Sequence, residues 1–172
     1  IAIGLGKQGF RIIRFNFSYM KLSQVSGKKR PPNATNMLIN EWSSVISEIG
    51  CDNLIIGGKS MGGRVASMIK TNTKIKGIVC LGYPFHPPGK GENLRVSHLL
   101  SLSSPMLICQ GERDVFGSKA SINNLKLPDI IKLHWLKDGD HSFKPKKSSE
   151  VTERDNLESA IKAVVEFIRN IT

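Results

Sequence analysis

The chain has 172 residues, a length that suits one domain with a single buried core, and we expect one domain over residues 1–172. Hydrophobic residues make up 40% and charged residues 23% of the sequence, which excludes a chain that is disordered throughout. No apolar run approaches the length of a membrane span, so this part of the protein is expected to be soluble.

The formal net charge of +11 raises the question of an acidic partner such as a nucleic acid. Most basic residues are scattered, and the two clusters, at residues 28–30 and 144–147, lack the interleaved aromatic side chains of nucleic-acid-binding surfaces. We therefore interpret the charge mainly as a solvated surface and do not expect a nucleic-acid partner.

The sequence contains three cysteines, Cys51, Cys80 and Cys109. Their number is odd, and their spacing is not that of metal ligands. Cys80 and Cys109 lie in apolar runs, where a thiol acts as a small hydrophobic group. We therefore expect a reducing, intracellular setting, the cytoplasm, and neither a metal nor another cofactor.

The first half of the chain begins with residues 1–9, which have the composition of the last turns of a helix ending at a glycine. Residues 10–17 are rich in aromatic and β-branched side chains and are predicted to form a strand. Residues 18–36 are polar and aperiodic and are predicted to form an exposed loop. Apolar residues at helical spacing predict an amphipathic helix over residues 34–49, capped by Gly50.

In the rest of the chain, short apolar runs alternate with helical patterns. Strands are predicted at residues 54–56, 76–81, 105–110 and 130–136, a short helix at 118–125 and a final helix at 153–171. The apolar runs show little alternation, which is typical of strands buried on both faces. The sequence therefore predicts an α/β fold, with a mostly parallel sheet covered by helices on both faces.

A glycine-rich stretch follows the predicted strand at residues 54–56. Residues 58–62 read Gly-Lys-Ser-Met-Gly, the G-x-S-x-G pattern of a nucleophile elbow. We expect a side chain at Gly58 or Gly62 to collide with neighbouring backbone, and Ser60 to adopt a strained conformation at the carboxyl edge of the sheet. The backbone N–H of Met61, at the start of the next helix, would then be placed to donate to an oxyanion.

Two other interpretations apply to the same residues. Gly-Lys-Ser also occurs in phosphate-binding P-loops, but that motif needs a glycine five positions before Gly58, where Asn53 stands. A glycine-rich turn can also simply pack closely, with Ser60 an ordinary turn serine. The pattern alone does not show whether Ser60 is an ordinary turn serine or a nucleophile. The presence or absence of partner residues elsewhere in the chain must distinguish the two.

Ser60, Asp114 and His141 each follow a predicted strand. Because parallel strands end at one edge of the sheet, these side chains are expected to lie near one another. Their chain order, serine then acid then histidine, is that of α/β-hydrolases. Asp138 and Asp140 are alternative acids, but the chain order favours Asp114. The hypothesis is that Ser60 attacks a carbonyl, His141 takes its proton and Asp114 orients the imidazole.

Three further residues are candidates for the wall of a substrate pocket: Lys59 in the elbow, and Tyr83 and His86 in the loop after the second predicted strand. Lys59, together with Lys90, would favour an anionic substrate. The simpler interpretation is that the lysines are solvated and that the loop around His86 is structural. His98 has no motif around it.

On these residues the chain resembles small α/β-hydrolases of the dienelactone-hydrolase-like group. It is similar in particular to the family that includes a testis-expressed protein and a subunit of the non-specific-lethal histone acetyltransferase complex. The matching segments are residues 14–17, 57–64, 81–90, 110–114 and 138–142. The resemblance implies an α/β-hydrolase fold, with Ser60 as nucleophile, Asp114 as acid and His141 as base.

Members of the resembled family begin with earlier strands and a His-Gly-containing loop that supplies a second oxyanion donor, and residues 1–172 contain neither. In the sheet order of that fold, the strand before this loop lies between residues 10–17 and the strand at 54–56. We therefore expect an N-terminally truncated chain, with a gap in the sheet and unpaired backbone groups beside it.

The leading functional hypothesis is a serine hydrolase that acts on a small acyl substrate, an ester, thioester or lactone, through a Ser-His-Asp triad. The alternative is a catalytically silent scaffold whose surface binds a protein partner. The resemblance to a subunit of a chromatin complex supports this alternative, because a hydrolase fold can be retained without its chemistry.

Overall fold

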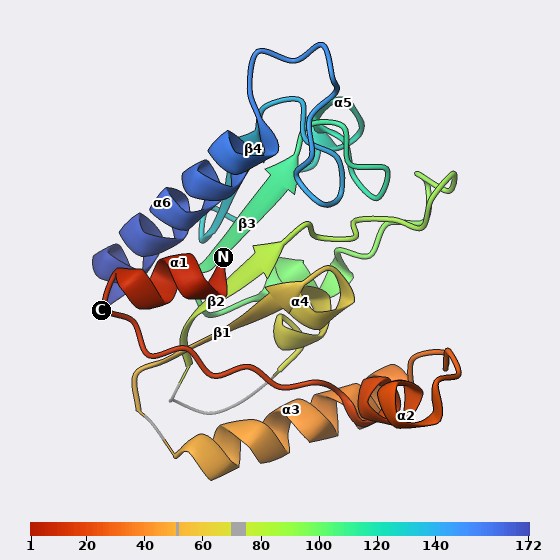
Figure 1. Cartoon of the computed structure of the whole chain (residues 1–172), viewed down its shortest axis with the longest axis vertical. Coiled ribbons are helices and arrows are strands. Elements are labelled where there is room, and N and C mark those ends of the chain that lie inside the picture. The colour runs from red at the N-terminus through yellow and green to blue at the C-terminus, as the bar shows by residue number, and fades with distance from the viewer. Residues whose placement is uncertain (51, 70–74) are drawn as a thin grey trace.

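The computed structural model describes residues 1–50, 52–69 and 75–172. Within these residues, four strands form one parallel sheet in the order β1-β2-β3-β4 (Figure 1). The strands are β1 (Leu54–Lys59), β2 (Ile75–Leu81), β3 (Met106–Gly111) and β4 (Ile131–Leu136). The α/β fold with a parallel sheet, predicted from the sequence, is confirmed.

Helices cover both faces of this sheet (Figure 1). The helices α1 (Ala2–Lys7) and α6 (Glu153–Ile171) pack on one face, and α3 (Thr35–Ile49) and α4 (Met61–Ala66) pack on the other. Successive side chains of β2 alternate between the two cores: Ile78 and Cys80 join the core on the α3 and α4 side, and Val79 joins the core under α6. The strands are therefore buried on both sides, as their apolar runs predicted.

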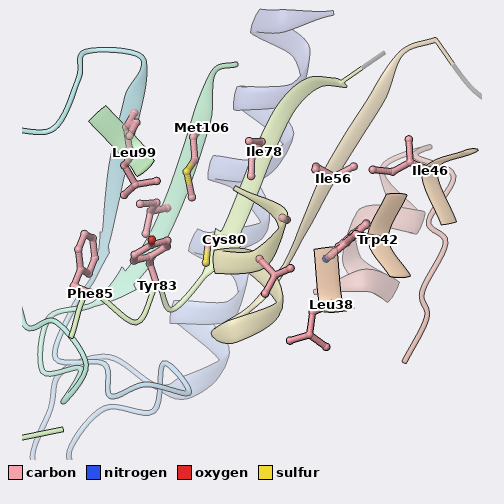
Figure 2. Packing of buried hydrophobic residues seen from close by; sticks show 14 of the residues in the cluster. Leu38, Trp42, Ile46, Ile56, Ile78, Cys80, Tyr83, Phe85, Leu99 and Met106 are labelled. Atoms are coloured by element: carbon pink, nitrogen blue, oxygen red, sulfur yellow. The ribbon is translucent and has the colours of Figure 1, made fainter. Parts of the chain in front are cut away.

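The core on the α3 and α4 side holds the largest buried side chains (Figure 2). Trp42 of α3 packs in the same cluster as Ile56, Ile78 and Met106 from three successive strands. Burial of each such side chain stabilises the fold by about 1.5–3 kcal/mol. Val65 of α4 belongs to the same cluster, so this core also holds α4 against the sheet.

The last helix, α6, has the predicted bounds. Its start is fixed by a capping box: Thr152 Oγ1 accepts from Asp155 N at 3.2 Å, and the Asp155 carboxylate accepts from Thr152 N at 2.8 Å. The helix α3 begins one residue after its predicted start and ends before Gly50, which has the expected positive φ of 66°. In the described part of the chain, no helix has both the length and the hydropathy needed to cross a membrane.

The predicted strand at residues 10–17 is wrong. This segment runs beside β1 (Figure 1), but a cavity of about 600 Å³ lies between the two, so no hydrogen-bonded ladder joins them. Its aromatic residues pack on α3 instead, with the Phe15 ring 4.7 Å from Trp42 and 5.4 Å from Phe17. Among the described residues, no strand pairs with the outer edge of β1, which is the place where the sequence led us to expect a gap.

The predicted loop at residues 18–36 is also wrong in its first half, which forms α2 (Ser18–Ser26). The backbone N–H and the hydroxyl of Ser18 both donate to the Glu41 carboxylate of α3, at 2.7 and 2.9 Å. Gly27, with φ 66°, ends the helix. No residue of α2 is buried, so the sequence carries no apolar periodicity that would reveal the helix.

Two smaller elements complete the fold. The short helix α5 (Lys119–Ile122) lies within the predicted range of 118–125, and Ser118 caps it by accepting from Ser121 N at 3.2 Å. A 3₁₀ helix, η1 (Ser97–Ser101), was not predicted. It buries Leu99 in the core (Figure 2).

The close approach of α4 to the sheet depends on two glycines. A β-carbon at Gly58 would lie 2.9 Å from the backbone of Gly62 and Gly63. A β-carbon at Gly63 would collide with Cys80 Sγ and would lie 2.6 Å from the carbonyl oxygen of Gly58. The predicted collision at Gly58 is confirmed, but the one at Gly62 is wrong, because a β-carbon there would meet no atom within 4 Å outside its own helix turn. The crowded position is Gly63, one residue after Gly62.

This packing predicts opposite effects for two neighbouring substitutions. Gly63→Ala should lower the free energy of unfolding by roughly 1–3 kcal/mol, because the added methyl group forces α4 away from the sheet. Gly62→Ala is the matched control: open space and the helix propensity of alanine should raise the free energy by up to about 1 kcal/mol. Urea unfolding measures both. A midpoint for Gly63→Ala equal to that of Gly62→Ala would contradict the packing.

Candidate active site

Ser60 lies at the sharp junction between β1 and α4. Its φ of 52° and ψ of −121° are rare for a residue other than glycine, which is the strained conformation expected from the sequence. The turn is held by two backbone bonds: Ser60 N donates to Leu81 O at 2.9 Å, and Arg64 N donates to Ser60 O at 3.0 Å. The serine is therefore fixed at the carboxyl edge of the sheet.

Asp114 and His141 form a hydrogen-bonded pair at the same edge. His141 Nδ1 lies 2.8 Å from Asp114 Oδ2. The Asp114 side chain is fully buried and also accepts from Phe116 N and Gln110 Nε2, each at 2.9 Å. Because the carboxylate accepts the Nδ1 proton, Nε2 is the imidazole nitrogen left free to accept another proton.

The other two candidate acids have different partners. Asp138 forms an ion pair with Arg113 at 2.8 Å. Asp140 Oδ1 accepts from the backbone of Ser142 at 2.7 Å and of Lys144 at 3.0 Å, which shapes the loop that carries His141. Of the three candidates, Asp114 is therefore the one that the structure brings to the histidine.

Ser60 and His141 both lie beside the end of β2. A β-carbon on Gly82 would lie 3.2 Å from the His141 ring, and Gly82 directly follows Leu81, to which Ser60 is bonded. The Phe116 ring lies 4.5 Å from the His141 ring and lines a cavity together with Ser60. Within the described residues no hydrogen bond joins the serine hydroxyl to the imidazole, and such bonds often tighten only when substrate binds.

Gln110, at the end of β3, is a site residue that sequence analysis missed. It is fully buried and accepts from Tyr83 N at 2.6 Å. Its Nε2 lies 2.9 Å from Asp114 Oδ2 and 3.0 Å from Gly117 O. The side chain thus ties the loop after β2 to the loop after β3. A polar residue in the apolar run at 105–110 was the available indication, because buried polar groups need partners.

Lys59 joins the elbow to the loop that carries the histidine. Its Nζ donates to His141 O at 2.8 Å, although the two residues are 82 positions apart. Burial lowers the pKa of Lys59, and the negative charges of Asp114 and Asp140 oppose that shift. Lys59 also lines a cavity of about 720 Å³ that includes Ser60, so it anchors the loop from the wall of the candidate site.

The other two predicted pocket residues lie in the interior. Tyr83 is fully buried in the core shown in Figure 2. His86 is 7% exposed, and its Nδ1 lies 2.9 Å from the carbonyl oxygen of Pro87. Neither residue lines either of the two cavities that contain Ser60. The structural interpretation of the loop around His86 therefore accounts for its placement.

A partly buried polar cluster lies between α4 and η1. His98 Nε2 lies 3.0 Å from Ser67 Oγ and 3.2 Å from the hydroxyl of Tyr83, which donates to Arg95 O at 2.8 Å. Burial, and then the charge of Arg64, lower the pKa of His98 to about 4. His98 is therefore neutral at physiological pH. Sequence analysis gave it no role.

The cysteines described by the structure are buried in strands. Burial raises the pKa of Cys109 to about 12 and that of Cys80 further, and neither is in a disulfide. Cys51 lies outside the described residues. Among residues 1–50, 52–69 and 75–172, no group of His, Cys, Asp and Glu side chains has an arrangement that could hold a metal ion.

The parallel sheet, the strained serine after β1 and the acid–histidine pair at the same edge are typical of the α/β-hydrolase class. The chain belongs to the alpha/beta hydrolase domain family, whose sequence model matches residues 1–169.

Solved structures have the same fold. A monoacylglycerol lipase from Paleococcus ferrophilus is 14% identical with a TM-score of 0.61, over 84% of this chain and 79% of the lipase. A thermophilic esterase from Thermogutta terrifontis is 14% identical with a TM-score of 0.60, over 84% and 75% of the two chains. An alpha-beta serine hydrolase homologue from Coxiella burnetii is 16% identical with a TM-score of 0.53, over 84% of this chain and 64% of the homologue.

The low pKa of His98 predicts a specific acid sensitivity. In the unfolded chain His98 binds a proton near pH 6.5, and in the folded chain only near pH 4. Between these values the unfolded state binds more protons, so the stabilisation is complete above pH 6.5 and is lost as pH falls toward 4. NMR titration of the folded protein should place the His98 midpoint near 4. A midpoint of 6 or above would contradict the burial of this ring.

Proposed function

We propose that the protein is a serine hydrolase that cleaves an acyl ester, thioester or lactone. Ser60 is the nucleophile, His141 the general base and Asp114 the acid that orients it. One observation carries the proposal: the 2.8 Å bond from His141 to the buried Asp114 carboxylate, at the sheet edge that also holds the strained Ser60.

Each half of the proposed reaction, acylation and then deacylation, uses two proton transfers through His141. Its Nε2 accepts the Ser60 proton while the serine oxygen attacks the substrate carbonyl carbon, and Asp114 stabilises the imidazolium. The oxyanion accepts a hydrogen bond from Met61 N–H, in the first turn of α4, where amide groups have no acceptor within the helix. Collapse expels the alcohol or thiol, which takes the proton from Nε2. Water then repeats the sequence, releases the carboxylic acid and regenerates Ser60.

The surroundings support a preformed acid–base pair. The three hydrogen bonds to the Asp114 carboxylate hold it in one orientation, so little reorganisation is needed when charge develops on the histidine. Lys59 holds the backbone of the His141 loop. Its contribution is to position the base.

We also infer that the chain belongs to the dienelactone-hydrolase-like group, on the strength of Gly-Lys-Ser-Met-Gly-Gly-Arg at residues 58–64. We infer further that residues 1–172 act as one catalytic domain on a small molecule in the cytoplasm. The unpaired thiols of Cys80 and Cys109 support a reducing compartment.

A fluorophosphonate probe tests the nucleophile. The protein should be labelled, and Ser60→Ala should abolish labelling because the probe reacts with an activated serine hydroxyl. Ser101→Ala, at an exposed serine of η1, is the matched control and should label like the parent. Intact-protein mass spectrometry gives the readout. A folded protein that stays unlabelled would favour the alternative of a silent scaffold that binds a protein partner.

Substitution of two aspartates tests the acid. Asp114→Asn should lower kcat for a p-nitrophenyl ester roughly 10³- to 10⁴-fold, because the amide no longer stabilises the imidazolium or selects its tautomer. Asp140→Asn is the control, since an asparagine oxygen can still accept from Ser142 N and Lys144 N. It should change kcat by about twofold or less. Equal losses of kcat in Asp114→Asn and Asp140→Asn, with unchanged unfolding midpoints, would contradict the assignment of Asp114 as the acid.

A further inference from the structure

A second cavity beside Ser60 is lined by two arginines. Its volume is about 430 Å³, and Arg64 of α4, Arg95 of the loop after β2 and Phe116 line it together with Ser60. Phe116 also contacts the His141 ring. A molecule in this cavity would therefore be within reach of the serine hydroxyl and of both guanidinium groups.

The two arginines have no acidic partner among the residues that the structure describes, whereas other surface cations do. Arg113, Lys119 and Arg154 are each within 2.8 Å of a carboxylate. The Nε of Arg64 is buried and makes no hydrogen bond with any described residue. Partly buried like charges without a counterion repel each other, and a bound anion would relieve that repulsion.

The electrostatics of Arg64 agree with this picture. Burial lowers the pKa of Arg64, the nearby phenol of Tyr83 opposes the shift, and the charge of Arg95 lowers the pKa further. The positive charges of the two guanidinium groups therefore repel each other. His98, on the same side of α4, is neutral at physiological pH and adds no charge of its own.

The amino end of α3 adds a third positive contribution. Thr35, in the first turn of this 15-residue helix, lines the same cavity. That turn contains no acidic residue, and the side chain of Ala34 does not cap it. The amino end of α6, in contrast, carries Glu153 and Asp155. No acidic side chain in the first turn of α3 therefore offsets the partial positive charge of the α3 amino end, although the Asn36 side-chain oxygen accepts from Met37 N at 2.9 Å.

We propose that Arg64 and Arg95 form an arginine subsite, which binds a terminal carboxylate or phosphate group on the acyl chain that Ser60 attacks. A guanidinium fork matches the oxygens of both anions. This subsite rests on the hydrolase function proposed above. The substrates would be half-esters of short dicarboxylic acids, or esters whose acyl chain ends in a phosphonate or phosphate group. Hydrolysis of a half-ester consumes one water and releases the alcohol and the dicarboxylate.

Paired substrates of equal length test the arginine subsite. Mono-(p-nitrophenyl) glutarate should have a kcat/KM at least about tenfold above that of p-nitrophenyl pentanoate, which corresponds to about 1.4 kcal/mol of transition-state binding. Arg95→Gln and Arg64→Gln should bring the ratio of the two values close to one. Arg154→Gln removes an equal charge from the exposed face of α6 and should leave the ratio as in the parent.

A phosphonate substrate identifies the preferred anion. If the p-nitrophenyl ester of 4-phosphonobutanoate has a higher kcat/KM than the glutarate half-ester, the subsite takes a phosphate-like group, and the reverse order indicates a carboxylate. A parent ratio near one for both anionic substrates, with clear hydrolysis of the pentanoate ester, would overturn the subsite and leave the hydrolase proposal standing.

Binding to Ser60→Ala separates the two proposals when no ester is hydrolysed. By calorimetry, this variant should bind monomethyl glutarate at least about tenfold more tightly than methyl pentanoate. Addition of Arg95→Gln should remove the difference. Selective binding without hydrolysis or fluorophosphonate labelling would contradict the hydrolase and support the anion site. Equal binding of the two esters would overturn the anion site whatever the activity.

Discussion

The close contact of α4 with the sheet is the constraint on which the candidate site depends. Because Gly63 has no side chain, its backbone lies against Cys80 of β2 and the carbonyl of Gly58. Ser60 alone must then turn the chain from strand to helix, at a positive φ. That strain costs about 1–3 kcal/mol. Burial of Val65 and Ala66 in the core offsets it, so the strained turn at Ser60 is supported by buried apolar contacts.

A buried carboxylate imposes the second constraint. Asp114 has no access to water, and a buried charge costs several kcal/mol unless its oxygens are paired. His141, Phe116 N and Gln110 supply those partners. Gln110 also bonds the backbone of Tyr83, so the loop after β2 and the acid after β3 are positioned by one side chain. Loss of that side chain would disturb both loops at once.

The sequence predicts the long helices that bury one apolar face and misses α2, which buries no residue. The bounds of α6 follow from its apolar stripe, whereas α2 buries no residue and leaves no periodicity to detect. Residues 10–17 were mistaken for a strand because the side chains that favour pairing also favour aromatic packing. Phe15 uses that composition to contact Trp42. Composition alone does not tell these two uses apart.

The positions of Ser60, Asp114 and His141 at one edge were predictable, since parallel strands end together. Their supporting contacts were not, because contacts such as the Lys59–His141 bond join residues that only the fold brings close. The same holds for charge. A net charge of +11 suggests a solvated surface, yet among the described residues Arg64 and Arg95 have no carboxylate partner such as the one that Arg154 has. Whether a charged side chain has an ion-pair partner depends on the tertiary structure. The sequence therefore cannot show which arginines lie unpaired beside the reactive serine, and the fold can.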